Sequence, residues 1–172
     1  MLTPNMLHAL NAQINMELTA YYTYLSMSAW FTSENLNGLA AWMRHHADEE
    51  MMHAMKIYDF IQQRRGQVTL QAIPGPSVQW HSAVAALEDA LHHEEAVTAS
   101  INRLVDLARQ ERDHATDSFL QWFVDEQVEE EAVVDELLQQ LKRIGDFAPG
   151  LYMLDRDLLK GSGAEAEEGD AT

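Results

Sequence analysis

The chain of 172 residues contains no cysteine, which excludes disulfide bridges, thiolate metal sites, iron–sulfur clusters and cysteine nucleophiles. Proline and glycine are scarce, with 4 and 8 residues, so few positions interrupt a helix. No apolar run approaches the roughly 18–20 residues that a transmembrane helix needs. The N-terminus also lacks a basic segment followed by an apolar one, so no secretory signal is visible. We therefore expect a cytoplasmic protein without a membrane span.

Basic side chains are also few. The 11 lysine and arginine residues stand against 28 aspartate and glutamate residues, which gives a formal net charge of −17. The negative field of such a surface repels a phosphate backbone, so we expect no nucleic-acid partner. Acidity of this kind can serve solubility alone, or it can attract cations. Specific sites are needed to decide between the two.

Proline, glycine and the spacing of apolar residues divide the sequence into helical segments. Thr3-Pro4 is a typical helix start, because a capping side chain precedes proline at the first helical position. The expected long helices span residues 4–33, 39–65, 82–111 and 115–144. Residues 66–81 include Pro74-Gly75-Pro76 and are expected to form an extended connection.

The end of the chain differs in composition from the long helices. A short fifth helix is expected over residues 151–159, after a turn at Pro149-Gly150. Residues 161–172 have the composition of a disordered acidic tail. The sequence therefore predicts one all-α domain over residues 1–160, a four-helix bundle with one long crossover connection and a short C-terminal fifth helix.

Acidic side chains interrupt the apolar stripe of each long helix near its middle. In the fourth helix, for example, the flanking apolar residues are Phe123, Val133, Val134 and Leu137. The interrupting groups are Glu17 in the first helix, Glu50 and His53 in the second, Glu94 in the third, and Gln127 and Glu130 in the fourth. Helices packed with aligned ends would bring these groups to one level of the bundle.

Such a convergence has a chemical consequence. Burying several carboxylates together is strongly unfavourable unless they take up protons or bind cations. Four carboxylates, one imidazole and one amide suit a pair of metal ions, and mostly hard oxygen donors favour iron or manganese. Glu50 and His53, three residues apart on one helical face, can both reach the site. The fourth helix carries Gln127-x-x-Glu130, where a symmetric di-metal bundle would repeat Glu-x-x-His.

At these residues the chain resembles the bacterial non-haem ferritins, from Met1 to about Leu159. The segments that carry the resemblance are MLTPNMLHALNAQINMELTAYY, RHHADEEMMH, FLQWFVDEQVEEE and LYMLDRDL. The resemblance implies iron storage in a shell of 24 subunits. It also implies a ferroxidase centre in each bundle that oxidises ferrous iron with dioxygen or peroxide.

The resemblance also implies the role of each residue. Glu17, Glu50 and His53 would hold the first iron. The second iron would be held by Glu50, Glu94 and Glu130, with Gln127 alongside. Tyr24, on the same face as Glu17, would be the tyrosine that can donate an electron. A third iron site would be formed by Glu49, Glu126, Glu129 and Glu130.

Several alternatives are less well supported. Haem-containing bacterioferritins bind haem through a methionine at the position of Met51, but they keep the second Glu-x-x-His, so we expect no haem. Starved-cell DNA-binding ferritins build each iron site from two subunits and usually carry a basic tail. A carboxylate-bridged oxygenase or catalase of the same fold, and a non-enzymatic helical scaffold that binds cations, stay open.

A few further polar residues lie outside this centre. Five histidines are expected to face solvent or to make local hydrogen bonds, namely His45, His46, His92, His93 and His114. Asp113 and Asp117, near the turn into the fourth helix, could line an entry channel for iron at a threefold axis.

Overall fold

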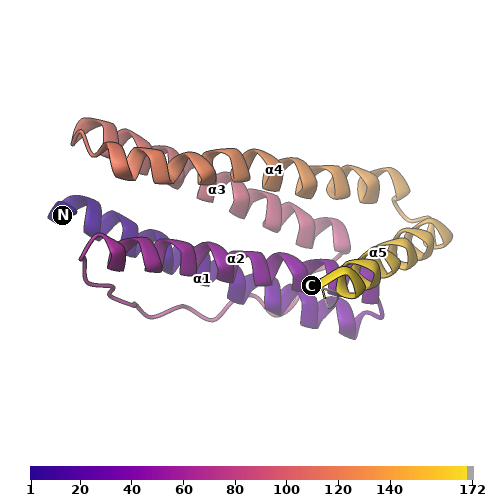
Figure 1. The fold of residues 1–172 in the computed structure, drawn as a ribbon. Helices are drawn as coiled ribbons and strands as arrows, with labels where there is room; N and C mark the ends of the chain where they lie inside the picture. Colours follow the sequence, from indigo (N-terminus) through magenta and orange to yellow (C-terminus); the bar gives the residue numbers. More distant parts are fainter. Residues whose placement is uncertain (170–172) are drawn as a thin grey trace.

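The computed structural model describes residues 1–169, and this part of the chain contains five helices and no strand. The helices are α1 (Pro4–Ser33), α2 (Asn37–Gln63), α3 (Ala83–Gln110), α4 (His114–Ile144) and α5 (Ala148–Gly169). In the bundle, α1 packs mainly against α2, and α3 packs mainly against α4 (Figure 1). No helix in the described range is long and apolar enough to cross a bilayer. The predicted all-α four-helix bundle is confirmed.

Three of the long helices, α1, α3 and α4, begin where short polar side chains cap them. The Thr3 hydroxyl accepts a hydrogen bond from the backbone N–H of Met6 at 3.1 Å, and Ser82 caps α3 in the same way. Asp113 caps α4 by accepting from the backbone N–H of Thr116. Such caps satisfy N–H groups that have no partner inside the helix. The predicted bounds of the four long helices are therefore correct to within two residues.

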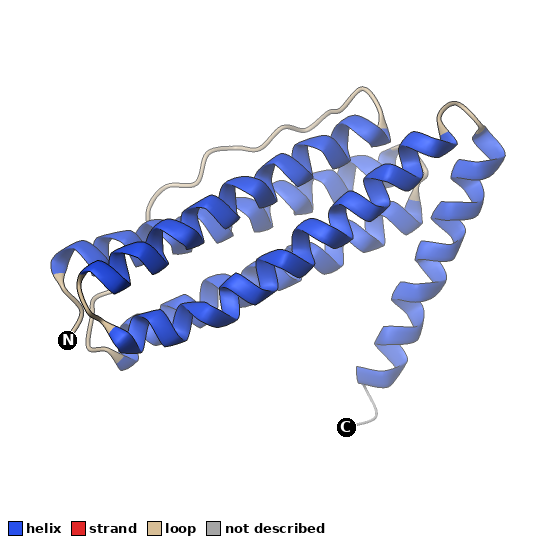
Figure 2. Ribbon diagram, turned by 90° about the horizontal axis from the view of Figure 1, so that it is seen from above, coloured by secondary structure: helices blue, strands red, loops and turns tan. Residues whose placement is uncertain are grey.

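Residues 64–82 connect α2 to α3 along the length of the bundle (Figure 2). Two side chains of α1 hold this connection. The Asn11 amide donates to the carbonyl of Gln67 at 3.2 Å and accepts from the backbone N–H of Thr69 at 2.6 Å. Further along α1, the Ser26 hydroxyl donates to the carbonyl of Ser77 at 2.6 Å. The connection thus returns the chain to the end where α2 began, which confirms the predicted crossover.

The core consists of two apolar clusters, one in each half of the bundle. The cluster toward the α1–α2 turn includes Tyr24, Met43, Leu87 and Leu138. The cluster toward the N-terminus of α1 includes Ile14, Ile57, Val97 and Phe123. Burial of this surface drives the helices together. Val133, expected in the apolar stripe of α4, is instead 43% exposed.

The fifth helix is longer than the sequence analysis predicted. It begins at Ala148 and ends at Gly169, whereas the prediction was residues 151–159. Residues 161–169, predicted as part of a disordered tail, are helical in the structure, and residues 170–172 lie outside the described part. The alanine and glutamate residues of 164–168 favour continued helix because both types have high helix propensity.

Contact between α5 and the start of α2 sets the position of α5. The Asp155 carboxylate of α5 accepts a hydrogen bond from the backbone N–H of Leu39 at 2.9 Å, where α2 has unsatisfied donors. Gly38 allows the approach, because a Cβ atom there would lie 1.8 Å from the carbonyl oxygen of Asp155. The two helices therefore require glycine at residue 38.

Replacing Gly38 with alanine is expected to lower the free energy of unfolding by about 1–3 kcal/mol, because the added methyl overlaps the backbone of α5. This loss outweighs the gain of up to about 1 kcal/mol that alanine normally brings inside a helix. Denaturant unfolding followed by circular dichroism measures the change. Gly75→Ala is the matched control, because no heavy atom lies within 4 Å of its Cβ position. Equal stability of the two variants would contradict the proposed contact.

Candidate metal centre

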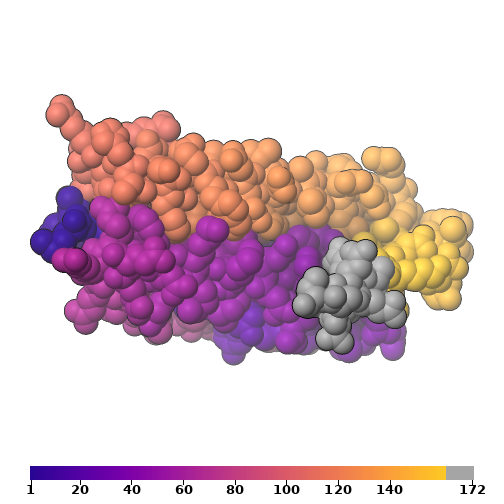
Figure 3. Space-filling view, viewed as in Figure 1, coloured from indigo at the N-terminus to yellow at the C-terminus, as the bar shows by residue number. Residues whose placement is uncertain are grey.

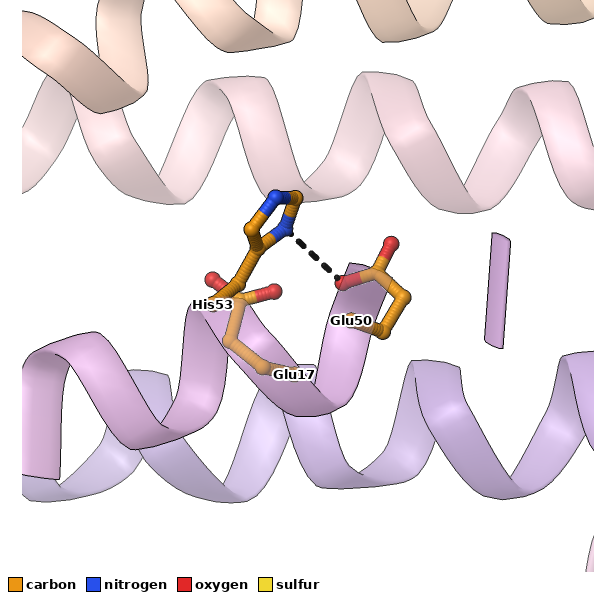
Figure 4. Close-up of side chains that lie close together, drawn as sticks. All are labelled: Glu17, Glu50 and His53. Atoms are coloured by element: carbon orange, nitrogen blue, oxygen red, sulfur yellow. Dashed lines mark ion pairs between the residues drawn. The ribbon is translucent and has the colours of Figure 1, made fainter. Parts of the chain in front are cut away.

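Glu17 of α1 and the pair Glu50 and His53 of α2 converge between the two apolar clusters. Their relative exposures are 0%, 2% and 1%. One ligand atom from each residue lies within 4.8 Å of the other two. Figure 4 shows the carboxylates and the imidazole ring pointing toward the same space. The predicted convergence at one depth of the bundle is therefore present for these three residues.

Three atoms of this group are buried without a hydrogen-bond partner in the part of the chain that the structure describes. They are Glu17 Oε2, Glu50 Oε2 and His53 Nε2. Buried polar atoms are usually hydrogen-bonded, because an unpaired one loses the solvation it had in water. Among the described residues, Glu50 Oε2 makes only an ion-pair contact with His53 Nδ1 at 3.4 Å, and His53 Nε2 only one with Glu126 at 3.7 Å, so these lone pairs are available to a cation. The donor set thus fits a metal ion with a preference for oxygen and imidazole ligands.

The pKa shifts of the two carboxyl groups also indicate a site for a cation. Burial raises the pKa of the Glu17 carboxyl. The pKa of Glu50 is raised well above its ordinary value, first by burial and then by repulsion from Glu17 and Glu94. Both groups therefore favour the protonated form without a cation. A metal ion that binds here would displace those protons.

Glu94 faces the centre from α3, but its two oxygens already have partners. The Tyr24 hydroxyl donates a hydrogen bond to Oε1, and the Gln127 amide donates to Oε2 at 3.2 Å. Burial raises the pKa of Glu94 to about 7, although the hydrogen bond from Tyr24 opposes this shift. Burial also raises the pKa of Tyr24, so the phenol remains a donor. Glu94 is absent from the three clusters of potential ligands found among the described residues.

Glu130 of α4 pairs with His46 of α2. His46 Nδ1 lies 3.2 Å from Glu130 Oε2 and 3.2 Å from Glu49 Oε2. Burial alone would raise the pKa of Glu130, but the hydrogen bond from His46 lowers it. Burial alone would lower the pKa of His46, but Glu130 raises it. The two groups therefore form a buried ion pair across the two hairpins.

His46 makes a local contact with Glu49, as the sequence analysis allowed, but it does not face solvent and it also pairs with Glu130 of α4. It is 7% exposed, and its ring packs on Trp42 with centroids 3.9 Å apart. The sequence contained a signal for this, because His46 lies seven residues before His53, on the same helical face. The Glu-x-x-His pattern includes His53 but not His46.

The other predicted residues of the third site lie around this ion pair. Glu126 Oε1 is 3.7 Å from His53 Nε2, and Glu126, His53 and Glu130 form a second potential ligand group. A third group consists of His46, Glu49 and Glu130. A pocket of about 610 Å³ between α2, α4 and α5 is lined by Glu49, Glu126 and the exposed Glu129. Figure 3 shows α2 (purple) and α4 (orange) meeting along a seam on this face of the bundle.

The remaining residues singled out in the sequence have other surroundings. His45, His92 and His114 are exposed, as predicted. His93 is half-buried against the Tyr24 ring, with centroids 5.8 Å apart. Asp113 pairs with Arg64 at 3.0 Å, and Asp117 pairs with Arg109 at 3.3 Å. Their role in an entry channel stays a prediction, since each carboxylate is already bound to a guanidinium.

Comparison with known proteins agrees with this arrangement. Residues 7–144 match the ferritin-like domain family. The chain is 39% identical to the bacterial non-heme ferritin of Staphylococcus aureus (strain MRSA252) over 158 residues, which cover 92% of this chain and 95% of that protein. It is 40% identical to that of Staphylococcus saprophyticus over 167 residues, which cover 97% of this chain and all of that protein.

A solved structure described as a novel open pore ferritin from the hyperthermophilic archaeon Archaeoglobus fulgidus superposes with a TM-score of 0.91. Its sequence is 46% identical, and the match covers 92% of this chain and 98% of that chain. The family model, the sequence identities and the superposed structure all indicate ferritins, and the buried carboxylate–histidine centre fits that family. This chain therefore belongs to the ferritin family.

Proposed function

We propose that the chain is a subunit of an iron-storage protein that oxidises ferrous iron at the buried centre and stores the ferric product. The observation that carries the proposal is the group of Glu17, Glu50 and His53, with its unpartnered ligand atoms at the middle of the bundle. Membership of the ferritin family supports iron as the metal. The net charge of −17 supports attraction of cations to the protein.

Each side chain has a defined task in this proposal. Glu17 and His53 bind the first ferrous ion, and Glu50 bridges it to the second. Glu94 and Glu130 bind the second ion, and Gln127 holds Glu94 in place. This requires Glu130 to exchange His46 for the metal, and Glu94 to bind the metal while it keeps its hydrogen bond from Gln127. Two ferrous ions held side by side can each give one electron to the same dioxygen or peroxide molecule, and the fixed carboxylates stabilise the ferric charge that results.

The residues around the His46–Glu130 pair are proposed as the third iron site. Glu49, Glu126 and Glu129 offer carboxylates at or beside the pocket, so iron leaving the paired site has further ligands nearby. His46 adds a nitrogen atom that the sequence did not lead us to include. A cation that binds there would displace the proton that His46 shares with Glu130, so that both the imidazole nitrogen and the carboxylate become ligands.

Tyr24 is proposed as the electron donor next to the paired site. The ring is 1% exposed, and its hydroxyl donates a hydrogen bond to a carboxylate oxygen of Glu94. A phenol that loses an electron also gives up its proton, and Glu94 is placed to accept it.

Storage requires an enclosed space, and we propose a shell of 24 subunits as in the family that the sequence resembles. The docking of α5 beside the α1–α2 turn supports this, because α5 leaves apolar side chains uncovered. Tyr152 and Met153 are 67% and 54% exposed. Exposed large apolar side chains on one helix favour a contact with another chain.

Size-exclusion chromatography combined with ferrous iron titration in air tests the proposal. The protein is expected to elute as an assembly of many subunits of 19.5 kDa and to retain far more iron than its own side chains can bind. A monomeric bundle that binds iron only in proportion to its ligand sites would instead favour the cation-binding scaffold. An assembly that neither oxidises nor retains iron would contradict the proposed function.

A further inference from the structure

Gln13 is a buried amide on α1, one helical turn before Glu17, and its relative exposure is 1%. Both ends of its side chain are used. Its Nε2 donates a hydrogen bond to Glu17 Oε1 at 2.8 Å. Its Oε1 accepts a hydrogen bond from the Ser100 hydroxyl of α3 at 2.5 Å. The amide therefore links a candidate metal ligand on one hairpin to the other hairpin.

The partners of Gln13 fix the orientation of its amide. Glu17 must be ionised to bind a metal, and an ionised carboxylate only accepts hydrogen bonds, so Nε2 must face Glu17 in the metal-bound state. A flipped amide would place its oxygen against the carboxylate. The Ser100 hydroxyl can rotate to donate, and it holds the amide oxygen on the side away from Glu17. The Glu17 carboxylate thus selects the orientation of the amide, and Ser100 anchors the amide in that orientation.

The hydrogen bond from Gln13 gives the two oxygens of Glu17 different roles. Oε1 is engaged by the amide, whereas Oε2 is buried and has no hydrogen-bond partner among the described residues. Oε2 is therefore the oxygen left for a cation, in the group with Glu50 and His53. The hydrogen bond lowers the ability of Oε1 to bind a cation and leaves Oε2 as the stronger donor, so it favours binding through one atom.

Gln127 makes a corresponding contact on the other side of the centre. Its Nε2 donates to Glu94 Oε2 at 3.2 Å and lies 3.3 Å from the Thr98 hydroxyl. Two buried amides therefore support two carboxylates that approach the centre from different hairpins. Gln127 belongs to the ligand pattern of the fourth helix, whereas Gln13 belongs to no pattern that the sequence analysis used.

We propose that Gln13 is a positioning residue that holds Glu17 as a one-oxygen ligand of the first metal, with Ser100 anchoring its amide. The inference rests on the proposed function, since it names what prepares one ligand of that site. Hydrogen bonds behind a metal ligand orient it before the metal arrives, and their loss typically lowers metal affinity or activity by about 10–100-fold.

Titration with Co²⁺ under exclusion of iron tests this inference, because Co²⁺ absorbs visible light and its spectrum reports the number of bound ligand atoms. Gln13→Leu is expected to weaken binding at the first site by about 10–100-fold. It should also change the shape of the Co²⁺ spectrum, since a freed Glu17 can bind through both oxygens. Ser100→Ala removes one neutral hydrogen bond and should weaken binding by about two- to tenfold.

Asn11→Leu is the matched control. Asn11 is another buried amide of α1, but it bonds the crossover connection and not the centre. This variant is expected to unfold at a lower temperature while it binds Co²⁺ with the wild-type affinity and spectrum. If Gln13→Leu behaved in the same way, Gln13 would be a structural residue only.

The outcomes separate this inference from the function on which it rests. Wild-type protein that binds no Co²⁺ and oxidises no iron would overturn the proposed function and the inference with it. Wild-type protein that does both, together with wild-type Co²⁺ affinity in Gln13→Leu and Ser100→Ala, would overturn the inference alone. If Gln13→Leu fails to fold, Ser100→Ala decides, because a serine-to-alanine change inside a helix is conservative.

Discussion

Replacing Glu50 with alanine is expected to lower the initial rate of ferrous iron oxidation by more than about 100-fold, beyond the usual effect of residues behind a ligand. The carboxylate of Glu50 interacts with those of Glu17, Glu94 and Glu130, so it is the group best placed to bridge two metals. Without it, two ferrous ions are no longer held where one oxidant can take an electron from each. Stopped-flow absorbance of the ferric product measures the initial rate.

Two further variants make this experiment decisive. Glu50→Gln keeps the size of the side chain and removes its charge, so a slow rate in both variants cannot come from a cavity. Glu95→Gln is the matched control, because Glu95 lies on the exposed face of α3 next to Glu94 and should oxidise iron at the wild-type rate. Rapid oxidation by both Glu50 variants would rule out the buried centre as the ferroxidase site.

The metal-free protein is expected to lose stability as the pH rises, and Glu94→Gln is expected to remove part of that loss. The folded-state pKa of Glu94 is about 7, raised from 4.5 by burial. Between these values the folded chain binds more protons than the unfolded chain, so the free energy of unfolding falls with rising pH. A glutamine at this position does not ionise, and its side-chain oxygen can still accept from Tyr24.

The size of this effect follows from the shift. Each pKa unit corresponds to about 1.4 kcal/mol, so the stability of Glu94→Gln relative to wild type should rise by about 3 kcal/mol from pH 4.5 to about pH 8. Urea unfolding with a chelator present measures it at each pH. Glu95→Gln should show no such trend. A difference between Glu94→Gln and wild type that stays constant with pH would show that Glu94 ionises freely in the folded chain.

Metal binding should reverse this pH dependence in the wild type. A bound cation requires ionised carboxylates, so its stabilising effect increases as the pH rises. The same carboxylates that destabilise the metal-free bundle at neutral pH then stabilise the loaded one. The buried centre is therefore unfavourable for folding unless its cation is present.

The helices could be predicted because their signals are local. Apolar residues at helical spacing, the cap at Thr3 and the interruption at Pro74-Gly75-Pro76 all act over a few residues. The end of α5 could not be predicted in this way, because the composition of residues 161–172 is typical of a disordered segment. Residues 164–168 favour helix, and the overall composition of the segment does not reveal this local preference.

The convergence of Glu17, Glu50 and His53 could also be predicted from the sequence. Their depths along α1 and α2 are fixed by residue number, and a hairpin with a short turn brings equal depths together. The partners of the other groups could not be predicted. Which oxygen of Glu94 meets Tyr24 depends on the rotation of α1 against α3, and sequence spacing contains no information on that angle.

The sequence by itself determined the helix order, the crossover and the level at which the carboxylates meet, because these depend on periodicity and chain length. Only the tertiary structure decided that His46 binds Glu130, that Gln13 holds one oxygen of Glu17, and that α5 packs against Gly38. These contacts join residues far apart in the chain, and each depends on distances of a few ångströms between packed helices. Such distances are set by side-chain packing across the whole bundle rather than by local pattern.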